Sequence, residues 1–215
     1  MPIAKKIETE AGFLGIWEIS ETSDSLLKEY QFSSKEKEEF EKIKAEKRRI
    51  EYIASRLLVQ NLLNVKNEII YEATGKPILK NQAFNISISH SANLVAVLIS
   101  KKNIGVDVEL CNRNIDKVAK RFLSNEEFRT VENSNNPQIA KIIYWGAKES
   151  IFKCSDYNGV HFYKQILISP FPIGDEGIFD GKLISGTDTE YFKLWYFTFQ
   201  NNMVVFCVED KTKAM

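Results

Sequence analysis

The sequence predicts an α+β fold of two similar lobes related by a pseudo-twofold, each with a long helix packed on an antiparallel sheet. The main observation is that a long helical segment precedes a set of strands twice along the chain: residues 40–63 before strands 84–89 and 94–100, and residues 137–154 before strands 165–169, 177–184, 191–199 and 203–209. There is also no long linker, which indicates closely packed lobes. We expect an N-terminal lobe at 1–103 and a C-terminal lobe at 104–215.

The composition narrows the functional classes. Among 215 residues, 29 basic and 29 acidic side chains give a formal net charge of zero, so we expect neither a nucleic-acid nor a membrane partner. The three cysteines, Cys111, Cys154 and Cys207, are far apart and odd in number, which argues against a disulfide framework or a zinc site. The same cysteine usage favours a reducing cytoplasm, where we expect this protein. The first residues also lack the apolar core of a signal peptide.

In the N-terminal half, residues 12–19 predict a strand and residues 23–30 a short helix. Ser33 is a typical helix cap, and the helical pattern then runs to about residue 63. That stretch carries a basic cluster whose ordinary interpretation is a solvated helix face; its members are Lys47, Arg48, Arg49 and Arg56.

A turn and a hairpin complete this half. Gly75-Lys76-Pro77 is a turn signal between two short apolar runs. Residues 84–89 alternate between apolar and polar and end at His90, and residues 94–100 form the hairpin partner. His90 by itself is as consistent with a core histidine as with a ligand.

The next strand, Ile104–Leu110, carries two carboxylates on one face. Its apolar residues alternate with Gly105, Asp107 and Glu109, so we expect the apolar side to face the core and the carboxylates to lie side by side opposite. Two close carboxylates raise each other's pKa, and their oxygens suit Mg²⁺. The alternative is a solvated acidic face.

The second long helix places a third carboxylate in an apolar stripe. Two helical signals precede it, at residues 115–123 and from the capping serine Ser124. Along residues 137–154, Glu149 falls in step with Ile142, Trp145 and Phe152. An ionised carboxylate in that stripe is costly unless something compensates it, and the simplest alternative is an ion pair with Lys153 at i+4.

Four local motifs then occur in a fixed order: GKP at 75–77, SISHS at 87–91, IGVDVE at 104–109 and WGAKESIFK at 145–153. Together they closely resemble the 4′-phosphopantetheinyl transferase superfamily, of the pseudo-dimeric surfactin-synthetase type. RFLSNEEF at 121–128 resembles the family too, whereas Gly146 departs from it, because members often have Ser, Cys or Thr there. The resemblance implies an enzyme that moves the phosphopantetheine arm of coenzyme A to a serine of an apo acyl or peptidyl carrier protein, with Mg²⁺, and releases adenosine 3′,5′-bisphosphate.

The resemblance also implies roles for individual residues. Asp107, Glu109 and Glu149 would hold Mg²⁺, and Glu149 and Lys153 would take part in catalysis, with either Glu149 or a metal-bound water as the general base. Lys153 would also reach the phosphates. The other residues implied in coenzyme A binding are Lys148, Lys76, Ser89, His90, Arg56, and Arg49 or its neighbour Arg48.

We expect a monomer that docks an acidic carrier protein on the stretch after the acidic strand. Its basic residues are Arg113, Lys117, Lys120 and Arg121, and its apolar ones are Ile115, Val118 and Phe122. The alternative there is an ordinary amphipathic helix, and which carrier protein is modified stays open.

Two other functions remain possible at this point. One is a metal-dependent phosphohydrolase or nuclease, although His90 and His161 are the only histidines and such sites commonly use more of them. The other is an inactive relative that only binds carrier proteins.

Overall fold

The computed structural model describes residues 3–155, 157 and 159–213, and it divides the chain into two compact units, Met1–Lys101 and Lys102–Met215. We call them the first and the second unit and describe each by itself. Both combine helices with antiparallel sheets, so the predicted α+β class is confirmed.

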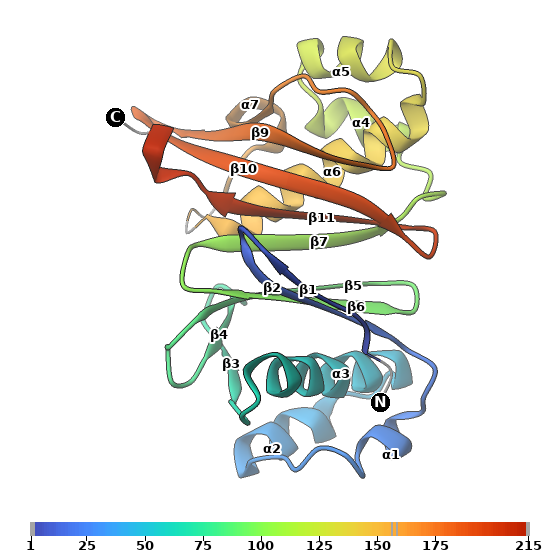
Figure 1. The fold of residues 1–215 in the computed structure, drawn as a ribbon, viewed down its shortest axis with the longest axis vertical. Helices are drawn as coiled ribbons and strands as arrows, with labels where there is room; N and C mark the ends of the chain where they lie inside the picture. The colour runs from blue at the N-terminus through green and yellow to red at the C-terminus, as the bar shows by residue number, and fades with distance from the viewer. Residues whose placement is uncertain (1–2, 156, 158, 214–215) are drawn as a thin grey trace. The chain divides into compact units, whose positions relative to one another are not determined.

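The first unit is built on a four-stranded sheet in the order β1-β2-β6-β5. Its helix α3 packs on β2 and β6, and Figure 1 shows it running along one face of the sheet with α1 and α2 on its outer side. A second, two-stranded sheet pairs β3 with β4. The bounds are β1 Ile3–Thr9, β2 Gly12–Glu18, α1 Ser23–Leu26, α2 Ser34–Lys42, α3 Glu46–Leu63, β3 Ile69–Tyr71, β4 Pro77–Leu79, β5 Asn85–Ser91 and β6 Leu94–Ser100.

The second unit is built on a five-stranded sheet in the order β7-β11-β10-β9-β8. Helix α6 packs along one face of this sheet, against β7 and β11 above all (Figure 1). The bounds are β7 Ile104–Leu110, α4 Asp116–Phe122, α5 Asn125–Glu132, α6 Pro137–Cys154, α7 Phe162–Gln165, β8 Ile166–Ile168, β9 Glu176–Ser185, β10 Asp188–Phe199, β11 Asn202–Glu209 and the 3₁₀ turn η1 Lys211–Lys213.

The core of the second unit lies on the face of β7 that carries the carboxylates. In the β7–β11 register Asp107 is opposite Val205, and Val205 belongs to the core beneath α6. Residues directly opposite in an antiparallel pair point to the same face. On the opposite face of β7, Ile104, Val106 and Val108 are buried as predicted, whereas Leu110 is only partly buried.

Gly105 is the physical reason for this orientation. A Cβ at this position would lie 1.8 Å from the carbonyl oxygen of Ser150, so any side chain would collide with the backbone of α6. Because glycine leaves that space open, α6 can approach β7 closely on the face that also carries Asp107 and Glu109.

The two units share a strand arrangement. In each, the strand that precedes the helices pairs with the last strand of the hairpin that follows them: β2 pairs with β6, and β7 with β11.

They also share a buried ion pair of the same construction. In both, a helix begins with a capping box whose Glu is buried and pairs with a fully buried cation on the long helix. In the first unit Glu36 lies 3.0 Å from Nε of Arg56, and in the second Glu127 lies 2.7 Å from Nζ of Lys148. The repeat therefore extends from the order of elements to individual residues.

Several element predictions need correction. Strand β1 was not predicted, because IAKKIET mixes apolar and charged residues without strict alternation. Helix α3 starts at Glu46 rather than as one segment from residue 40, since the chain is extended at Ile43 and Ala45.

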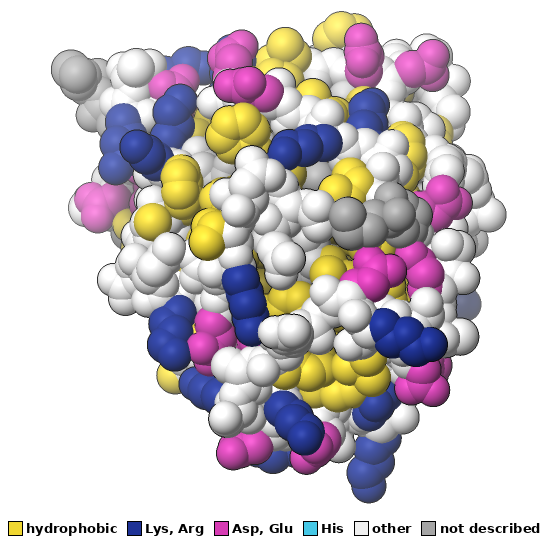
Figure 2. Space-filling view, turned by 60° about the horizontal axis from the view of Figure 1, so that its bottom comes forward, with side chains coloured by type: hydrophobic (Ala, Val, Ile, Leu, Met, Phe, Trp, Pro, Cys, Tyr) yellow, Lys and Arg dark blue, Asp and Glu magenta, His cyan; other side chains and the backbone are white. Residues whose placement is uncertain are grey.

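None of the helices in the part of the chain that the structure describes has the length and hydropathy needed to span a bilayer. On the face shown in Figure 2, basic and acidic side chains are interspersed, as the balanced composition predicts.

Candidate functional site

Asp107 is a buried carboxylate held by a lysine. It is 5% exposed, and its Oδ1 accepts a hydrogen bond of 2.7 Å from Nζ of Lys153. The same Nζ donates to the carbonyl oxygen of Val106 at 3.1 Å. Lys153 thus connects the end of α6 to β7. The sequence analysis considered Glu149 as its partner, whereas the structure pairs it with Asp107.

Glu109, two residues further along the same face, is held by two other donors. Its Oε1 accepts from Nε1 of Trp145 at 2.9 Å and from the guanidinium of Arg113. Its side chain is 12% exposed. Because both carboxylates of β7 are largely shielded from water, the interpretation as a solvated acidic face is wrong.

Glu149 projects from α6 towards these two carboxylates. Burial raises its pKa to about 7, with a further increase from the negative charge of Asp107, while Lys153 lowers it. Glu109 adds a smaller increase and Arg113 a smaller decrease. A carboxyl group that titrates near neutral pH in the free protein suits a residue that accepts a proton during a reaction.

Three aromatic rings lie near Glu149 in sequence or along the same helix face. Trp145 and Phe152 lie at i−4 and i+3 on the same face of α6. The ring of Phe162, from α7, lies 5.8 Å from the Trp145 ring and 5.7 Å from the Phe152 ring, so it links the two residues that flank Glu149. These three rings form an aromatic cluster along the face of α6 that carries Glu149.

The oxygens of the three carboxylates are suitable ligands for a divalent cation, but the three side chains are not arranged around one metal position. Carboxylate oxygens are typical Mg²⁺ ligands, and Asp107 and Glu109 both raise the pKa of Glu149, so the three groups repel one another. Among the residues that the structure describes, however, no group of three His, Cys, Asp or Glu side chains is arranged to hold a metal ion. Lys153 and Arg113 supply the positive charge in this arrangement.

The glycine at position 146 is explained by packing of α6 against the sheet. A Cβ at this position would lie 2.8 Å from Cγ2 of Val205 on β11 and 3.6 Å from Oδ2 of Asp107. The departure from the family's usual Ser, Cys or Thr thus accompanies a close approach of α6 to the sheet beside the carboxylates.

Two residues expected to bind coenzyme A have structural roles instead. Lys148 is fully buried, and its Nζ donates to Glu127 and to three carbonyl oxygens, those of Phe122, Phe162 and Ile166, at 2.6–3.0 Å. Lys148 therefore ties together the ends of α4, α5, α7 and β8. A side chain with no exposed surface cannot reach a ligand, and this prediction is corrected.

The prediction that Arg56 binds coenzyme A is corrected too, because this side chain is also buried. It is fully buried, pairs with Glu36, and its guanidinium lies 3.3 Å from the centre of the Tyr52 ring. Its Nη2 also donates to the carbonyl oxygen of Ile69 on β3.

The first unit brings Arg48, rather than Arg49, to His90. Nη1 of Arg48 lies 2.6 Å from Nε2 of His90 at the end of β5. Arg49 instead packs its guanidinium 4.0 Å from the centre of the Phe40 ring and donates to the carbonyl oxygen of Ile43. This geometry favours Arg48 as the partner of His90 in any ligand site.

The other predicted residues of this unit are placed as follows. Ser89, on β5 beside His90, is 7% exposed. Lys76 lies in the turn that leads into β4 and is partly buried. Glu51 on α3 was not predicted, although it lies 2.9 Å from Nη1 of Arg48. Its i+3 spacing from Arg48 was the signal that could have found it.

In the stretch after β7, the basic residues are exposed and two of the apolar residues are buried. Its four basic residues, Arg113, Lys117, Lys120 and Arg121, are exposed. Ile115 and Phe122 are each only 2% exposed and belong to the core. The predicted docking surface is therefore corrected to a basic one without those two apolar residues, with Val118 partly buried.

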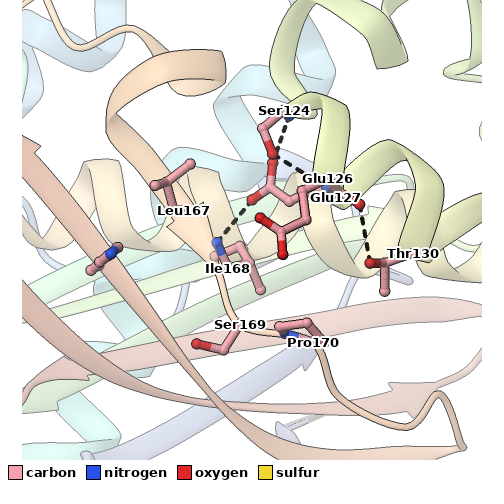
Figure 3. Close-up of a pocket in the computed structure, with 9 residues that line it drawn as sticks. Ser124, Glu126, Glu127, Thr130, Leu167, Ile168, Ser169 and Pro170 are labelled. Atoms are coloured by element: carbon pink, nitrogen blue, oxygen red, sulfur yellow. Dashed lines mark hydrogen bonds between the residues drawn. The ribbon is translucent and has the colours of Figure 1, made fainter.

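A pocket of about 180 Å³ lies elsewhere in the second unit, between α5 and the strands β8 and β9. Figure 3 shows Ser124, Glu126 and Glu127 on one side and the segment from Leu167 to Pro170 on the other. Glu127 is already engaged in its capping box and with the backbone N–H of Ile168. The pocket contains none of the predicted catalytic, coenzyme A or metal residues.

Comparison with known proteins matches residues 103–206 to the model of the 4′-phosphopantetheinyl transferase superfamily. The chain is 33% identical over 79 residues to a 4′-phosphopantetheinyl transferase of Bacillus subtilis, covering 36% of this chain and 34% of that protein. It is 36% identical over 91 residues to a fatty acid synthase subunit alpha of Candida parapsilosis, covering 41% of this chain and 5% of that protein. The chain thus spans about a third or less of the length of these curated relatives.

Among solved structures, the holo-[acyl-carrier-protein] synthase of Thermotoga maritima aligns with 19% identity and a TM-score of 0.35, covering 51% of this chain and 63% of that one. The segment that matches the superfamily model contains Asp107, Glu109, Glu149 and Lys153.

Proposed function

We propose that this chain, whose residues 103–206 match the 4′-phosphopantetheinyl transferase superfamily, is a holo-[acyl-carrier-protein] synthase. It would transfer the 4′-phosphopantetheine arm of coenzyme A to a serine of an apo acyl or peptidyl carrier protein. The observation that carries this proposal is the electrostatic coupling of Asp107, Glu109 and Lys153 to Glu149 within the matched segment.

In the proposed reaction, the serine oxygen forms a bond to the β-phosphorus of coenzyme A as the bond from that phosphorus to the bridging oxygen breaks. Adenosine 3′,5′-bisphosphate leaves with the bridging oxygen, and the serine proton passes to Glu149. A pKa near 7 gives Glu149 a sizeable ionised fraction at neutral pH and enough basicity to accept the proton.

Lys153 would balance charge during this step. Its side chain is 27% exposed and already lies against Asp107, so its ammonium group can serve both a carboxylate and the pyrophosphate. When bound by Asp107, Glu109 and Glu149, Mg²⁺ would neutralise the pyrophosphate oxygens and lower the pKa of Glu149.

The 3′-phosphate of coenzyme A would be bound by residues of the first unit. We assign this role to Lys76, Ser89, His90 and Arg48, with Arg48 in place of Arg49 because of its contact with His90. Guanidinium and ammonium donors suit a dianionic phosphate.

The carrier protein would dock on the exposed basic residues in and beside α4, because the helix after a carrier's modified serine is typically acidic. The remaining expectations belong to this proposal too: the pseudo-dimeric surfactin-synthetase type, a boundary between the lobes near residue 103 of the chain, a monomer, and a cytoplasmic location.

Mass spectrometry tests the proposal directly. Candidate apo carrier proteins are incubated with coenzyme A, Mg²⁺ and either the parent protein or Glu149→Gln. We expect one serine of a carrier to gain the phosphopantetheine mass with the parent only. Release of inorganic phosphate without a modified carrier would instead favour the phosphohydrolase, and carrier binding without transfer would favour an inactive binding protein.

A further inference from the structure

We infer that Glu51 is a positioning residue that holds Arg48 and His90 together as paired donors for one anionic group. This inference deepens the proposed function, because it rests on the assignment of the 3′-phosphate of coenzyme A to Arg48 and His90. Glu51 itself would not touch the ligand.

The geometry joins three side chains from two elements. Glu51, on α3, accepts a hydrogen bond of 2.9 Å from Nη1 of Arg48 through its Oε2. Its Oε1 lies 3.6 Å from Nδ1 of His90, on β5, and 3.9 Å from Nζ of Lys47. The same Nη1 of Arg48 lies 2.6 Å from Nε2 of His90. One guanidinium nitrogen is therefore shared by the carboxylate and the imidazole.

Exposure separates the positioning residue from the donors. The side chain of Glu51 is 5% exposed, whereas Arg48 is 60% and His90 36% exposed. A ligand in solvent can therefore reach the guanidinium and the imidazole but not the carboxylate. The carboxylate lies beneath the two donors and fixes both from the protein side.

The charges explain why a carboxylate is needed at this position. At the observed distance, Arg48 must donate to an imidazole nitrogen that carries no proton. If His90 is protonated, both groups become donors and like charges, and they stay close only with negative charge nearby. The carboxylate of Glu51 lies next to both donors and supplies that negative charge, and a phosphate oxygen accepts from both donors.

The alternative is that Glu51 only ties α3 to β5. That role would change protein stability but would affect two ligands equally if they differ only by the 3′-phosphate. The inferred role instead predicts a loss restricted to the ligand that carries the phosphate.

The experiment measures the dissociation constants of coenzyme A and 3′-dephospho-coenzyme A by isothermal titration calorimetry at pH 7. The proteins are the parent, Glu51→Gln, Glu51→Asp and the control Glu41→Gln, which removes an exposed carboxylate from α2. We expect the parent to bind coenzyme A more tightly than 3′-dephospho-coenzyme A. In Glu51→Gln, the ratio of the two dissociation constants should fall roughly tenfold, as for the loss of one charge-assisted contact.

The dephospho ligand should bind Glu51→Gln and the parent equally well. Glu51→Asp, which keeps the charge on a shorter side chain, should fall between parent and Gln variant, and Glu41→Gln should match the parent. In carrier modification, Glu51→Gln should raise KM for coenzyme A and leave kcat and the KM for the carrier unchanged.

Each other outcome overturns a defined statement. A parent without any preference for coenzyme A overturns the proposed phosphate ligands and this inference with them. A parent with the preference, unchanged in Glu51→Gln, overturns this inference alone, as does an equal loss for both ligands. If Glu51→Gln does not fold, Glu51→Asp decides: parental preference in that variant overturns the inference.

Discussion

At the scale of single residues, the candidate site has three carboxylates, Asp107, Glu109 and Glu149, and two cations next to them, Lys153 and Arg113. The protonation of Glu149 depends on this balance of charges. Asp107 and Glu109 are each held by a cation, through Lys153 and Arg113 respectively. Burial and the negative charges of Asp107 and Glu109 raise the pKa of Glu149 to about 7, although Lys153 and Arg113 act in the opposite direction. In the free protein, Glu149 is therefore partly protonated at neutral pH.

The first prediction concerns the pH dependence of stability without metal. A carboxyl group whose pKa is higher in the folded than in the unfolded state stabilises the fold below the unfolded value, here 4.5, and that contribution disappears as the pH rises through about 7. In EDTA, we expect the free energy of unfolding contributed by Glu149 to fall by on the order of 3 kcal/mol between pH 4.5 and 8.

Urea denaturation at several pH values measures this dependence. Glu149→Gln should show a flatter profile, because the glutamine does not titrate. Glu176→Gln, which removes an exposed carboxylate at the start of β9, should keep the parental profile. Parallel profiles for parent and Glu149→Gln would contradict the raised pKa.

The second prediction concerns Asp107, whose negative charge raises the pKa of Glu149. In the metal-free protein, Asp107→Asn should lower that pKa, since it removes a repelling charge and releases the ammonium group of Lys153 from its partner. Carbon-13 NMR of labelled glutamate carboxyl groups measures the titration midpoint. Asp116→Asn, an exposed acid paired with Lys141, should leave the midpoint of Glu149 unchanged.

At the scale of elements, the site depends on how closely α6 lies on β7 and β11. Two glycines permit this contact, Gly105 on the strand and Gly146 on the helix, because a Cβ at either would collide with the other element. The close approach places the carboxylates of β7 beside Glu149 and Lys153 of α6. The glycine in the IGVDVE motif is thus a packing requirement for the acidic pair.

The third prediction tests that requirement. In Gly105→Ala the new Cβ would lie 1.8 Å from the carbonyl oxygen of Ser150, which is backbone and cannot rotate away. We expect a loss of roughly 3 kcal/mol or more in the free energy of unfolding, measured by urea denaturation.

Gly174→Ala is the matched control, since the nearest atom to its added Cβ is 3.5 Å away. It should unfold at about the parental urea concentration. A Gly105→Ala protein as stable as this control would mean that α6 does not rest on β7 as described.

The fourth prediction concerns α4 as a docking element. Lys117, Lys120 and Arg121 are exposed, so their reversal to Glu should leave the core intact. We expect the triple variant to raise KM for an acidic carrier protein several-fold and to leave KM for coenzyme A unchanged. The effect should shrink at high salt, because exposed charges are screened beyond about 10 Å at 0.1 M ionic strength.

Reversal of three exposed lysines in and after α2, Lys37, Lys42 and Lys44, changes the net charge by the same amount. An equal effect of this control on KM for the carrier would indicate a general charge effect rather than a docking site at α4.

At the scale of the whole molecule, the two units have the same construction but carry different functional groups. Each has a long helix on an antiparallel sheet and a buried ion pair between a capping-box glutamate and that helix. The first unit carries the basic pair of Arg48 and His90, and the second carries the carboxylates. The residues assigned in the proposed reaction come from both units.

The fifth prediction tests the need for both units. A ligand that binds only the folded state stabilises it by about 2.7 kcal/mol at a hundredfold excess over Kd. We expect coenzyme A with Mg²⁺ to raise the melting temperature of the parent, and His90→Ala and Asp107→Asn each to reduce that rise. Differential scanning calorimetry measures the rise, and a full rise in either variant would show that the replaced residue does not bind the ligand.

The sequence by itself determined most of the local structure. Alternation and helical periodicity located α6 and the strands from β5 onwards to within a few residues, because each of these elements buries at least one continuous face. The four motifs likewise indicated the superfamily that residues 103–206 match. The short or charged elements β1 and α7 were missed, since neither carries a clear period.

Only the tertiary structure decided which charged residues are accessible. Lys148 and Arg56 look in the sequence like any other basic residue on a helix, yet both are fully buried on a glutamate from a distant helix cap. The choice of Arg48 over Arg49, and the part of Glu51, likewise depend on how α3 lies beside β5. Burial and pairing come from contacts between segments far apart in the chain, which a pattern along one segment cannot contain.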